Sequence, residues 1–443
     1  MNRQRGQVLL LCLIMAWLGV AALIFVFDSG QAVSAKSRTV TAADTAAFSA
    51  ASWRARVLNY NAYSNRAIVA QEVAVAQAIT LESWAYYFEH FTETMKDFSQ
   101  IYPPAYSFAR AVNELAQYSR QATEYAATAE IIARDAPGYG YKTLLAQSQR
   151  VMHYTASDFG LSAIAQEVAG TGDNRIKAYV LPVGTRHKQF VHRYESDPDR
   201  QRMRKVVERS LDRFTAGSRD ANFALPLPGG CLPLGGSVKD SLWQYKKRGG
   251  TKLAPGLDRW EAADTASIHV PVRKRFSRRC QSQELYPMGW GASELTTRSA
   301  RDEILANPGG VEISAYALDN AEDDLSDSKR FNHRGTGIAR VFDLNYERLQ
   351  NKRFPRNRVV VLAKLKHDKI RFSRALTEDG TRLTGKPQLP RDQMRAVGVA
   401  EVYFRRPPGT GRNGELASLY NPYWQVRLAT ATRAEKTVAA NAP

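Results

Sequence analysis

The chain has 443 residues, of which 44% are hydrophobic, so it is too long for one ordinary domain and apolar enough to build sizeable cores. Its net charge of +19 is uneven, because residues 1–180 carry 15 basic and 14 acidic side chains whereas the remainder carries 47 and 29. In a cytosolic protein this excess would suggest nucleic acid. The exported location predicted below excludes that partner and favours anionic lipid, cell-wall polymer or an acidic protein, or a basic surface with no single target.

The first recognisable element is an apolar stretch of twenty residues, Val8 to Phe27, that contains no charge. As a helix rising about 1.5 Å per residue it is roughly 30 Å long, which matches the hydrocarbon core of a bilayer. We therefore predict a transmembrane anchor. Its representative residues are Val8, Leu13, Trp17, Leu23 and Phe27.

The charges that flank the anchor predict its direction. Arg3 and Arg5 precede it and Asp28 follows it, which places the N-terminus in the cytoplasm and the rest of the chain outside. A second interpretation is a cleaved secretory signal, since residues 33–35 (Val-Ser-Ala) resemble a cleavage site. The apolar stretch of a signal is about 7–15 residues long, so the length of this one favours a retained anchor.

Residues 28–172 are predicted to form an extracytoplasmic helical bundle. The helix that begins in the membrane is expected to continue to about Phe98, followed by helices over 105–134 and 142–169 with prolines and glycines between them. Ala43, Ala47 and Ala50 fall on one face of the first helix, and small residues let helices approach closely.

Residues 173–428 are predicted to form a basic α+β domain with a mixed or antiparallel sheet, because short alternating or β-branched runs recur in it. These runs lie at 177–183, 266–272, 337–342, 358–364, 397–404 and 423–428. A basic helix is expected over 197–216, a Gly/Pro-rich loop over 217–256 and a disordered tail over 429–443. The predicted fold class of the whole chain is α+β, with residues 1–27 as cytoplasmic tip and anchor.

Three cysteines are present. Cys12 lies in the anchor, where it serves as a small apolar residue. Cys231 and Cys280 are predicted to pair in an oxidising compartment, and closing a loop of about 50 residues stabilises a fold by roughly 4 kcal/mol. Two separate buried thiols are the alternative.

Several short sequences match functional motifs, but the residues around them do not fit those motifs. The sequence at 409–414 has the form GxGxxG, but it follows two prolines and lacks the strand–turn–helix setting of a dinucleotide site. The DxSxS sequence at 324–328 lies in an acidic stretch and is interpreted as a solvated loop. His187 and His192 are spaced by five, which matches no usual metal pattern. No catalytic residue, metal ligand or cofactor is predicted.

Several stretches together resemble TadE/TadG-like proteins, which are associated with the assembly of the bacterial Flp (tight adherence) pilus. The N-terminal ones are Arg3–Gln7, the apolar span, Asp28–Gly30, Thr41–Ala47 and Asn59–Ala67, and the C-terminal ones are Ala400–Pro407 and Tyr420–Leu428. The resemblance implies that Asp28 marks the exit from the bilayer and that the alanine row packs against similar helices. The helix-packing residues are then Asp28, Ala43, Asp44, Ala47 and Ala50. Pilin-like relatives are cut after a glycine and carry a glutamate five residues later; after Gly6 that position is Leu11, so we expect no cleavage.

The resemblance implies assembly without chemistry. We expect a non-enzymatic structural or accessory component of Flp-type pilus assembly or related secretion, single-pass in the bacterial inner membrane, with its C-terminal part in the periplasm. Expected partners are other pilus-assembly or inner-membrane proteins, membrane lipid and an anionic envelope polymer, but not nucleic acid. The alternatives are an envelope-associated enzyme with a site within 174–428 and a cell-wall binding or adhesin module.

Overall fold

The computed structural model describes residues 5–183, 187–195, 197–229, 231, 242–254, 256–273, 280–297, 314–317, 319–320, 332–349, 355–372, 393–406 and 416–442. The chain packs as two compact units. Unit 1 comprises Met1–Tyr63, Gln149–His192 and Phe342–Pro443, and unit 2 comprises Ser64–Ser148 and Arg193–Val341. The domain boundaries predicted at 28–172 and 173–428 remain predictions, and the motifs at 324–328 and 409–414 lie outside the described residues.

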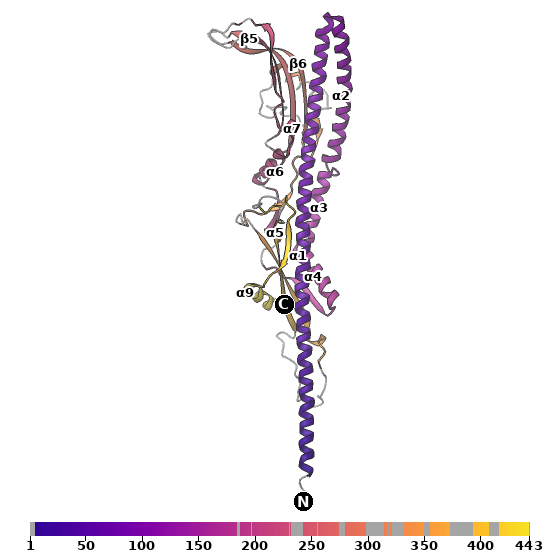
Figure 1. Cartoon of the computed structure of the whole chain (residues 1–443), viewed down its shortest axis with the longest axis vertical. Coiled ribbons are helices and arrows are strands. Elements are labelled where there is room, and N and C mark those ends of the chain that lie inside the picture. The colour runs from indigo at the N-terminus through magenta and orange to yellow at the C-terminus, as the bar shows by residue number, and fades with distance from the viewer. Residues whose placement is uncertain are drawn as a thin grey trace. The chain divides into compact units, whose positions relative to one another are not determined.

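A single helix, α1 (Arg5–Phe98), supplies the first segment of unit 1 and continues into unit 2 (Figure 1). Its predicted continuation beyond the apolar stretch is confirmed. No proline interrupts residues 29–98, and alanine, the strongest helix former, recurs throughout them. The short 3₁₀ helix η1 (Ser99–Ile101) and Pro103 end the run.

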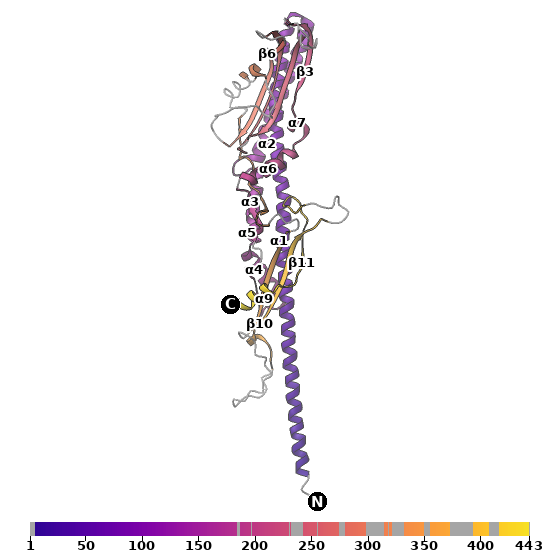
Figure 2. The ribbon, with the colours of Figure 1, turned by 90° about the vertical axis from the view of Figure 1, so that its left-hand side faces the viewer.

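Unit 1 is built on an antiparallel sheet in the order β1-β9-β10-β11. Its strands are β1 (Ile176–Val180), β9 (Arg356–Lys366), β10 (Gln393–Phe404) and β11 (Trp424–Leu428). Alternate residues of β9 and β10 point to opposite faces. One face packs on α1 and α4 (Asp158–Gly172), and the other packs on α9 (Arg433–Asn441). Figure 2 shows β10 and β11 alongside α1.

The remaining elements of unit 1 are short. They are α5 (His187–Phe190), β2 (Val191–Arg193), which pairs with β8 (Phe342–Leu344), and η4 (His367–Lys369). The predicted third helix is in fact two, α3 (Tyr141–Thr155) and α4. The break occurs because Ser157 caps the N-terminus of α4, its side chain accepting from Gly160 N.

The prediction of a disordered tail over 429–443 is wrong, because α9 lies within this range. Thr432 and Glu435 form a capping box at its start, and Glu435 accepts two hydrogen bonds from the guanidinium of Arg358 on β9. The apolar side chains Ala439 and Ala442 complete a small core on the outer face of the sheet. Composition alone did not reveal these long-range contacts.

Unit 2 contains the sheet β3-β4-β5-β6-β7, antiparallel except for the β6–β7 pair. The strands are β3 (Ala221–Pro228), β4 (Leu242–Leu253), β5 (Arg259–Arg273), β6 (Cys280–Thr296) and β7 (Asn332–Arg334). The helices are the later part of α1, α2 (Pro103–Asp135), the first part of α3, α6 (Asp197–Ser210) and α7 (Arg213–Ala216). The predicted α+β class is thereby confirmed.

The predicted Gly/Pro loop over 217–256 is wrong, since β3 and β4 lie within it. β3 is the edge strand of its sheet, where proline is tolerated because one side of the strand needs no hydrogen-bonding partner. Cys231, which follows β3, is bonded to Cys280 at the start of β6, with 5.9 Å between their Cα atoms. This is the pair that the sequence analysis proposed.

Candidate functional site

The apolar start of α1 is uncovered. The five representative anchor residues are 49% to 71% exposed. This helix is long and apolar enough to cross a membrane, and its most apolar window is not buried at all. Each large apolar side chain left in water costs roughly 1.5–3 kcal/mol relative to burial. An apolar environment around this stretch would therefore stabilise the chain.

The alanine row that follows is buried in the chain's own core. Ala43, Ala47 and Ala50 are fully buried and belong to the cluster that packs α1 on the sheet of unit 1. Asp28 is also fully buried, while Asp44 is half-buried and desolvation raises its pKa. A helix from another protein would have to use a different face of α1.

The approach of α1 to the sheet depends on a glycine. A Cβ atom at Gly398 of β10 would overlap the carbonyl of Ala43 and would lie 2.7 Å from the backbone nitrogen of Asp44. Only glycine lets two backbones approach so closely. The small side chains of α1 and Gly398 therefore form one complementary contact.

A buried arginine joins α1 to the start of α4. Arg54, 1% exposed, donates to Asn357 Oδ1 at 2.5 Å, to the carbonyl of Ala156, and to Asp158 Oδ1 at 2.9 Å. Burial lowers the pKa of Arg54 and the nearby Asp158 carboxylate opposes this. The guanidinium thus satisfies the carbonyl that the break between α3 and α4 leaves free.

Two histidines of unit 1 form a buried pair. His153 Nδ1 lies 2.9 Å from His187 Nε2, and His153 Nε2 lies 3.3 Å from Asn61 Oδ1. Because the Asn61 amide group donates to the carbonyl of Phe342, its oxygen must accept from His153. His187 Nε2 therefore donates to His153 Nδ1, and both rings are neutral.

Acidification is expected to destabilise unit 1 through these rings. Burial lowers the pKa of His153 from 6.5 to about 4, and lowers that of His187 well below its usual value. Between pH 6.5 and 4 the unfolded chain binds more protons than the folded one, so stability falls as the pH falls. His153 alone contributes a loss of about 3 kcal/mol by pH 4.

The measurement is the melting temperature of the full chain in detergent at pH 7 and pH 4.5. His153→Gln should reduce the difference between the two pH values, whereas the control His367→Gln, on η4, should not. Equal acid sensitivity of the His153→Gln variant and the wild-type chain would contradict the assignment of neutral rings.

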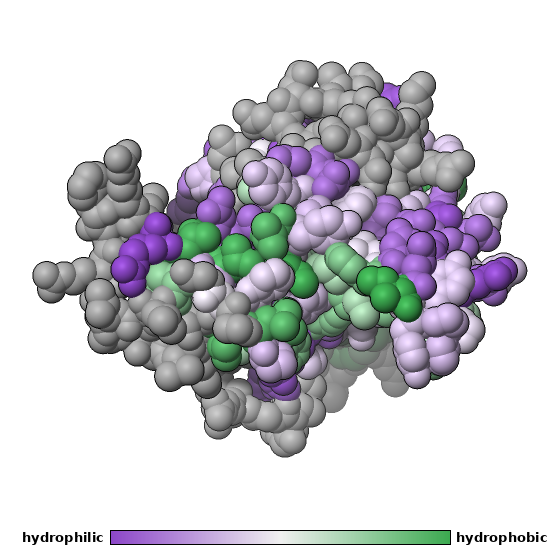
Figure 3. Space-filling model, turned by 90° about the horizontal axis from the view of Figure 1, so that it is seen from above, coloured by the Kyte–Doolittle hydropathy of each residue, from purple (hydrophilic) through white to green (hydrophobic). Residues whose placement is uncertain are grey.

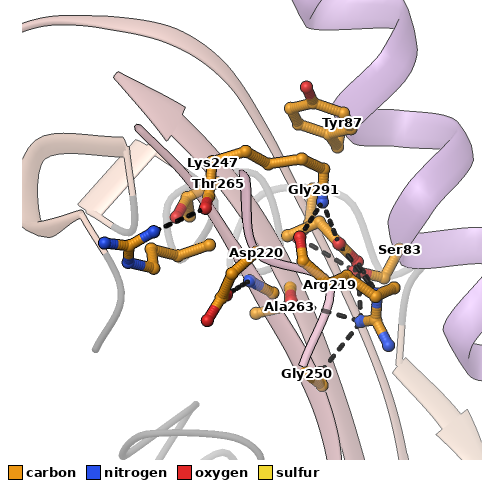
Figure 4. A network of polar contacts seen from close by, with 12 residues as sticks. Ser83, Tyr87, Arg219, Asp220, Lys247, Gly250, Ala263, Thr265 and Gly291 are labelled. Atoms are coloured by element: carbon orange, nitrogen blue, oxygen red, sulfur yellow. Dashed lines mark hydrogen bonds and ion pairs between the residues drawn. The ribbon is translucent and has the colours of Figure 1, made fainter. Parts of the chain in front are cut away.

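Unit 2 holds its part of α1 through a buried ionic network (Figure 4). Asp264 of β5 is fully buried and contacts Arg219 Nη2 at 2.8 Å, Lys247 Nζ at 2.7 Å and Ser83 Oγ at 3.0 Å. Ser83 Oγ also lies 3.1 Å from the carbonyl oxygen of Gly291 on β6, so the two acceptors share its single proton. Ser83 is the member of this network on α1, so the carboxylate fixes that helix to the sheet.

Two further buried contacts lie along the same stretch of α1. Lys142 Nζ lies 2.9 Å from Glu72 Oε1 and 2.6 Å from Asp135 Oδ1. Burial acts to lower the pKa of Lys142, but the two carboxylates together raise it. Glu82 accepts from His333 Nε2 at 2.7 Å and from Ser293 Oγ at 2.5 Å. These groups are buried and paired with one another, although Oε1 of Glu82 and Oδ2 of Asp135 have no hydrogen-bonding partner among the described residues.

Two pockets of unit 1 are lined without acid–base pairs. One, of about 650 Å³, lies between α1 and α4 and includes Trp53, Arg56 and Phe159. The other, of about 430 Å³, is lined by Lys36, Arg395 and Lys436 together with small apolar residues. Neither is lined by a carboxylate, histidine or cysteine. Among the described residues, no group of three or more His, Cys, Asp or Glu side chains could hold a metal ion.

The chain combines an exposed apolar helix start, long enough to cross a membrane, with folded units into which the same helix continues without a break. Residues 6–53 match a family model described as putative Flp pilus-assembly TadE/G-like. The predicted resemblance is confirmed over this range, which contains the apolar stretch and the alanine row, and it connects the chain with Flp pilus assembly. No curated protein and no solved structure matches the chain.

Sequence reasoning missed the residues that hold α1 in place. Arg54, a cation within an alanine-rich helix, was the most visible signal that a buried partner was required. Asp264 and Gly398 gave no such signal, because their importance depends on residues far away in the chain. His187 was compared only with His192, whereas its hydrogen-bonding partner is His153, 34 positions earlier.

Proposed function

We propose that this chain is a non-enzymatic, membrane-anchored structural or accessory component of Flp-type pilus assembly or related secretion. The observation that carries the proposal is the coincidence of the matched segment with one continuous helix. The first part of that helix is bare and apolar, and the next part is the centre of a folded core. Such a segment fixes a folded body to a membrane.

The same proposal states that the chain catalyses no reaction. It is supported by the burial of the carboxylates Glu72, Glu82, Asp135 and Asp264 in unit 2. It is also supported by the lining of two pockets of unit 1, which consists of cations, polar and apolar side chains without a general acid–base pair. Substrate conversion requires titratable groups that a substrate can reach.

The proposed location is the bacterial inner membrane, with the N-terminus in the cytoplasm and the remainder in the periplasm. The basic residues before the anchor and the disulfide beyond it support this direction. The proposed partners are other pilus-assembly or inner-membrane proteins, membrane lipid around the anchor, and an anionic envelope polymer for the basic part of the chain.

The experiment places charges within the anchor of the full-length chain. Leu13→Arg together with Leu18→Arg should move the protein from the membrane fraction to the soluble fraction, since each central arginine costs about 2.5–3.5 kcal/mol on insertion. Surface piliation should fall to the level of a strain that lacks the gene. Leu13→Val with Leu18→Val is the matched control and should behave as wild type.

Electron microscopy of surface pili and a fractionation blot provide the two readouts. Normal piliation in the deletion strain would defeat the proposed role. Normal piliation with the soluble double-arginine variant would defeat the anchoring part alone.

A further inference from the structure

Helix α2 has two faces of different character. Its inner face packs in unit 2, where Ala116, Ala127 and Ile131 are buried and Asn113 accepts a hydrogen bond from Thr92 of α1 at 3.0 Å. Its outer face carries large apolar side chains in solvent. They are Phe108 (73% exposed), Leu115 (64%), Tyr118 (71%), Tyr125 (77%) and Ile132 (50%). In Figure 1, α1 runs along one side of α2 and no labelled element lies along the other.

These outer residues follow a heptad repeat. With three alanines they form a series whose spacings alternate between three and four without exception, and every member is exposed. We call this series the outer seam: Phe108, Ala111, Leu115, Tyr118, Ala122, Tyr125, Ala129 and Ile132. A repeat of 3.5 residues sustained along a helix is the pattern that packs against another helix in a coiled coil. The repeat therefore indicates that the partner of this face is another helix.

The exposed area is sufficient for a stable contact. A large apolar side chain at these exposures presents roughly 100–200 Å², so the five large residues offer on the order of 700 Å² on each copy. A standard interface takes about 800 Å² from each partner. Exposed hydrophobic residues continue at the η1 end of α2, with Ile101 93% and Tyr102 64% exposed. Figure 3, viewed from that end, shows hydrophobic side chains (green) among hydrophilic ones.

The residues that flank the outer seam indicate an identical helix as the occupant. Flanking positions of a coiled coil usually select a partner through opposite charges. Here they are small or uncharged except for Glu114. In a parallel pair Glu114 faces Ser119 of the other copy, so no like charges meet. The flanking residues are Ser107, Val112, Glu114, Ser119, Gln121, Ala126, Thr128 and Ala133.

We propose that α2 is a contact between two copies of this chain, which pair in parallel through the outer seam. The parallel direction rests on the proposed function, because copies anchored in one membrane share the direction of α1. The pairing itself rests only on the exposure and the period of α2. A symmetric contact of this kind uses the same patch on both copies.

The test is disulfide cross-linking of the full-length chain in lipid vesicles. Cys12 is first replaced by alanine, so that the anchor cannot cross-link. In a parallel pair the two copies of residue 118 face each other, so Tyr118→Cys should give a disulfide-linked dimer under mild oxidation. Arg110→Cys, exposed on α2 but outside the outer seam, should give at least tenfold less.

Two charges on the outer seam should abolish the contact. Leu115→Glu with Tyr125→Glu should lower cross-linking through position 118 at least tenfold, whereas Ala105→Glu, which precedes the repeat, should leave it unchanged. Retention of the Cys231–Cys280 bond and of the helical circular dichroism signal shows that each variant is folded.

Equal cross-linking at positions 110 and 118, or a folded monomer in vesicles at every protein density, would overturn the pairing. A disulfide between Leu115→Cys on one copy and Tyr125→Cys on another, without one at 118, would overturn the parallel direction. It would also count against a shared membrane direction. Normal dimers in vesicles together with normal piliation in the strain that lacks the gene would support the pairing and defeat only the proposed function.

Discussion

Replacing Gly398 with alanine is expected to destabilise unit 1 by about 3 kcal/mol. The new Cβ atom would overlap the carbonyl of Ala43, so α1 and β10 would have to move apart along a tightly packed contact. Faster hydrogen exchange in peptides from β9 and β10, measured by mass spectrometry at increasing denaturant, would report the loss.

Gly170→Ala is the matched control. Gly170 lies in α4, where an added Cβ would have Gln166 Nε2 as its nearest neighbour at an ordinary 3.8 Å. Alanine is favoured over glycine inside a helix by up to about 1 kcal/mol, so this variant should be as stable as wild type or more stable. Similar exchange rates for the two variants would show that the Gly398 contact does not limit the distance between α1 and β10.

Replacing Asp264 with alanine is expected to destabilise unit 2 by about 3–5 kcal/mol. The change leaves Arg219 and Lys247, whose side chains are 5% and 12% exposed, without the carboxylate that compensates them. It also removes one of the two acceptors of Ser83 on α1. Denaturant unfolding followed by hydrogen exchange in β4 and β5 provides the measurement.

Glu208→Ala serves as its control, since Glu208 pairs with Arg204 one turn away on α6 and is 39% exposed. Such a pair contributes about 0.5 kcal/mol or less. A loss below 1 kcal/mol for Asp264→Ala would mean that water reaches the network, contrary to its burial. Changing Asp264, Arg219 and Lys247 together to apolar residues should recover part of the stability, because no charge then stays buried alone.

Much of the fold was accessible from local patterns. The length of α1 follows from the absence of proline, and α2 follows from its bounding prolines. The β-branched or alternating runs at 358–364 and 397–404 predict the strands β9 and β10. The apolar stretch from Val8 to Phe27 needed only its length and composition. These features depend on residues close together in the chain, which is where sequence reasoning is strongest.

The buried contacts that hold α1 are harder to predict, because they join residues that are far apart in the sequence. The alanine row was assigned to contacts with other helices, whereas Gly398, more than 350 positions later, lies against Ala43. The sequence analysis predicts a disordered tail over 429–443, whereas Arg358 of β9 stabilises the helix there through Glu435. The outer seam of α2 lay in the sequence as a regular heptad series, but only the exposure of α2 showed that it is unoccupied within the described part of the chain.

The unbroken course of α1 has a mechanical consequence. A helix of 94 residues is about 140 Å long, and it contains no proline hinge through which tension could relax. In the proposed anchored state, a pull on the N-terminal end of α1 loads the Ala43–Gly398 contact of unit 1 and the Ser83–Asp264 contact of unit 2 in shear, along the helix axis. Contacts that are loaded in shear must break at the same time, whereas contacts that are pulled apart from one end break one after another. In that proposed state the chain therefore resists the extraction of α1 from its own cores.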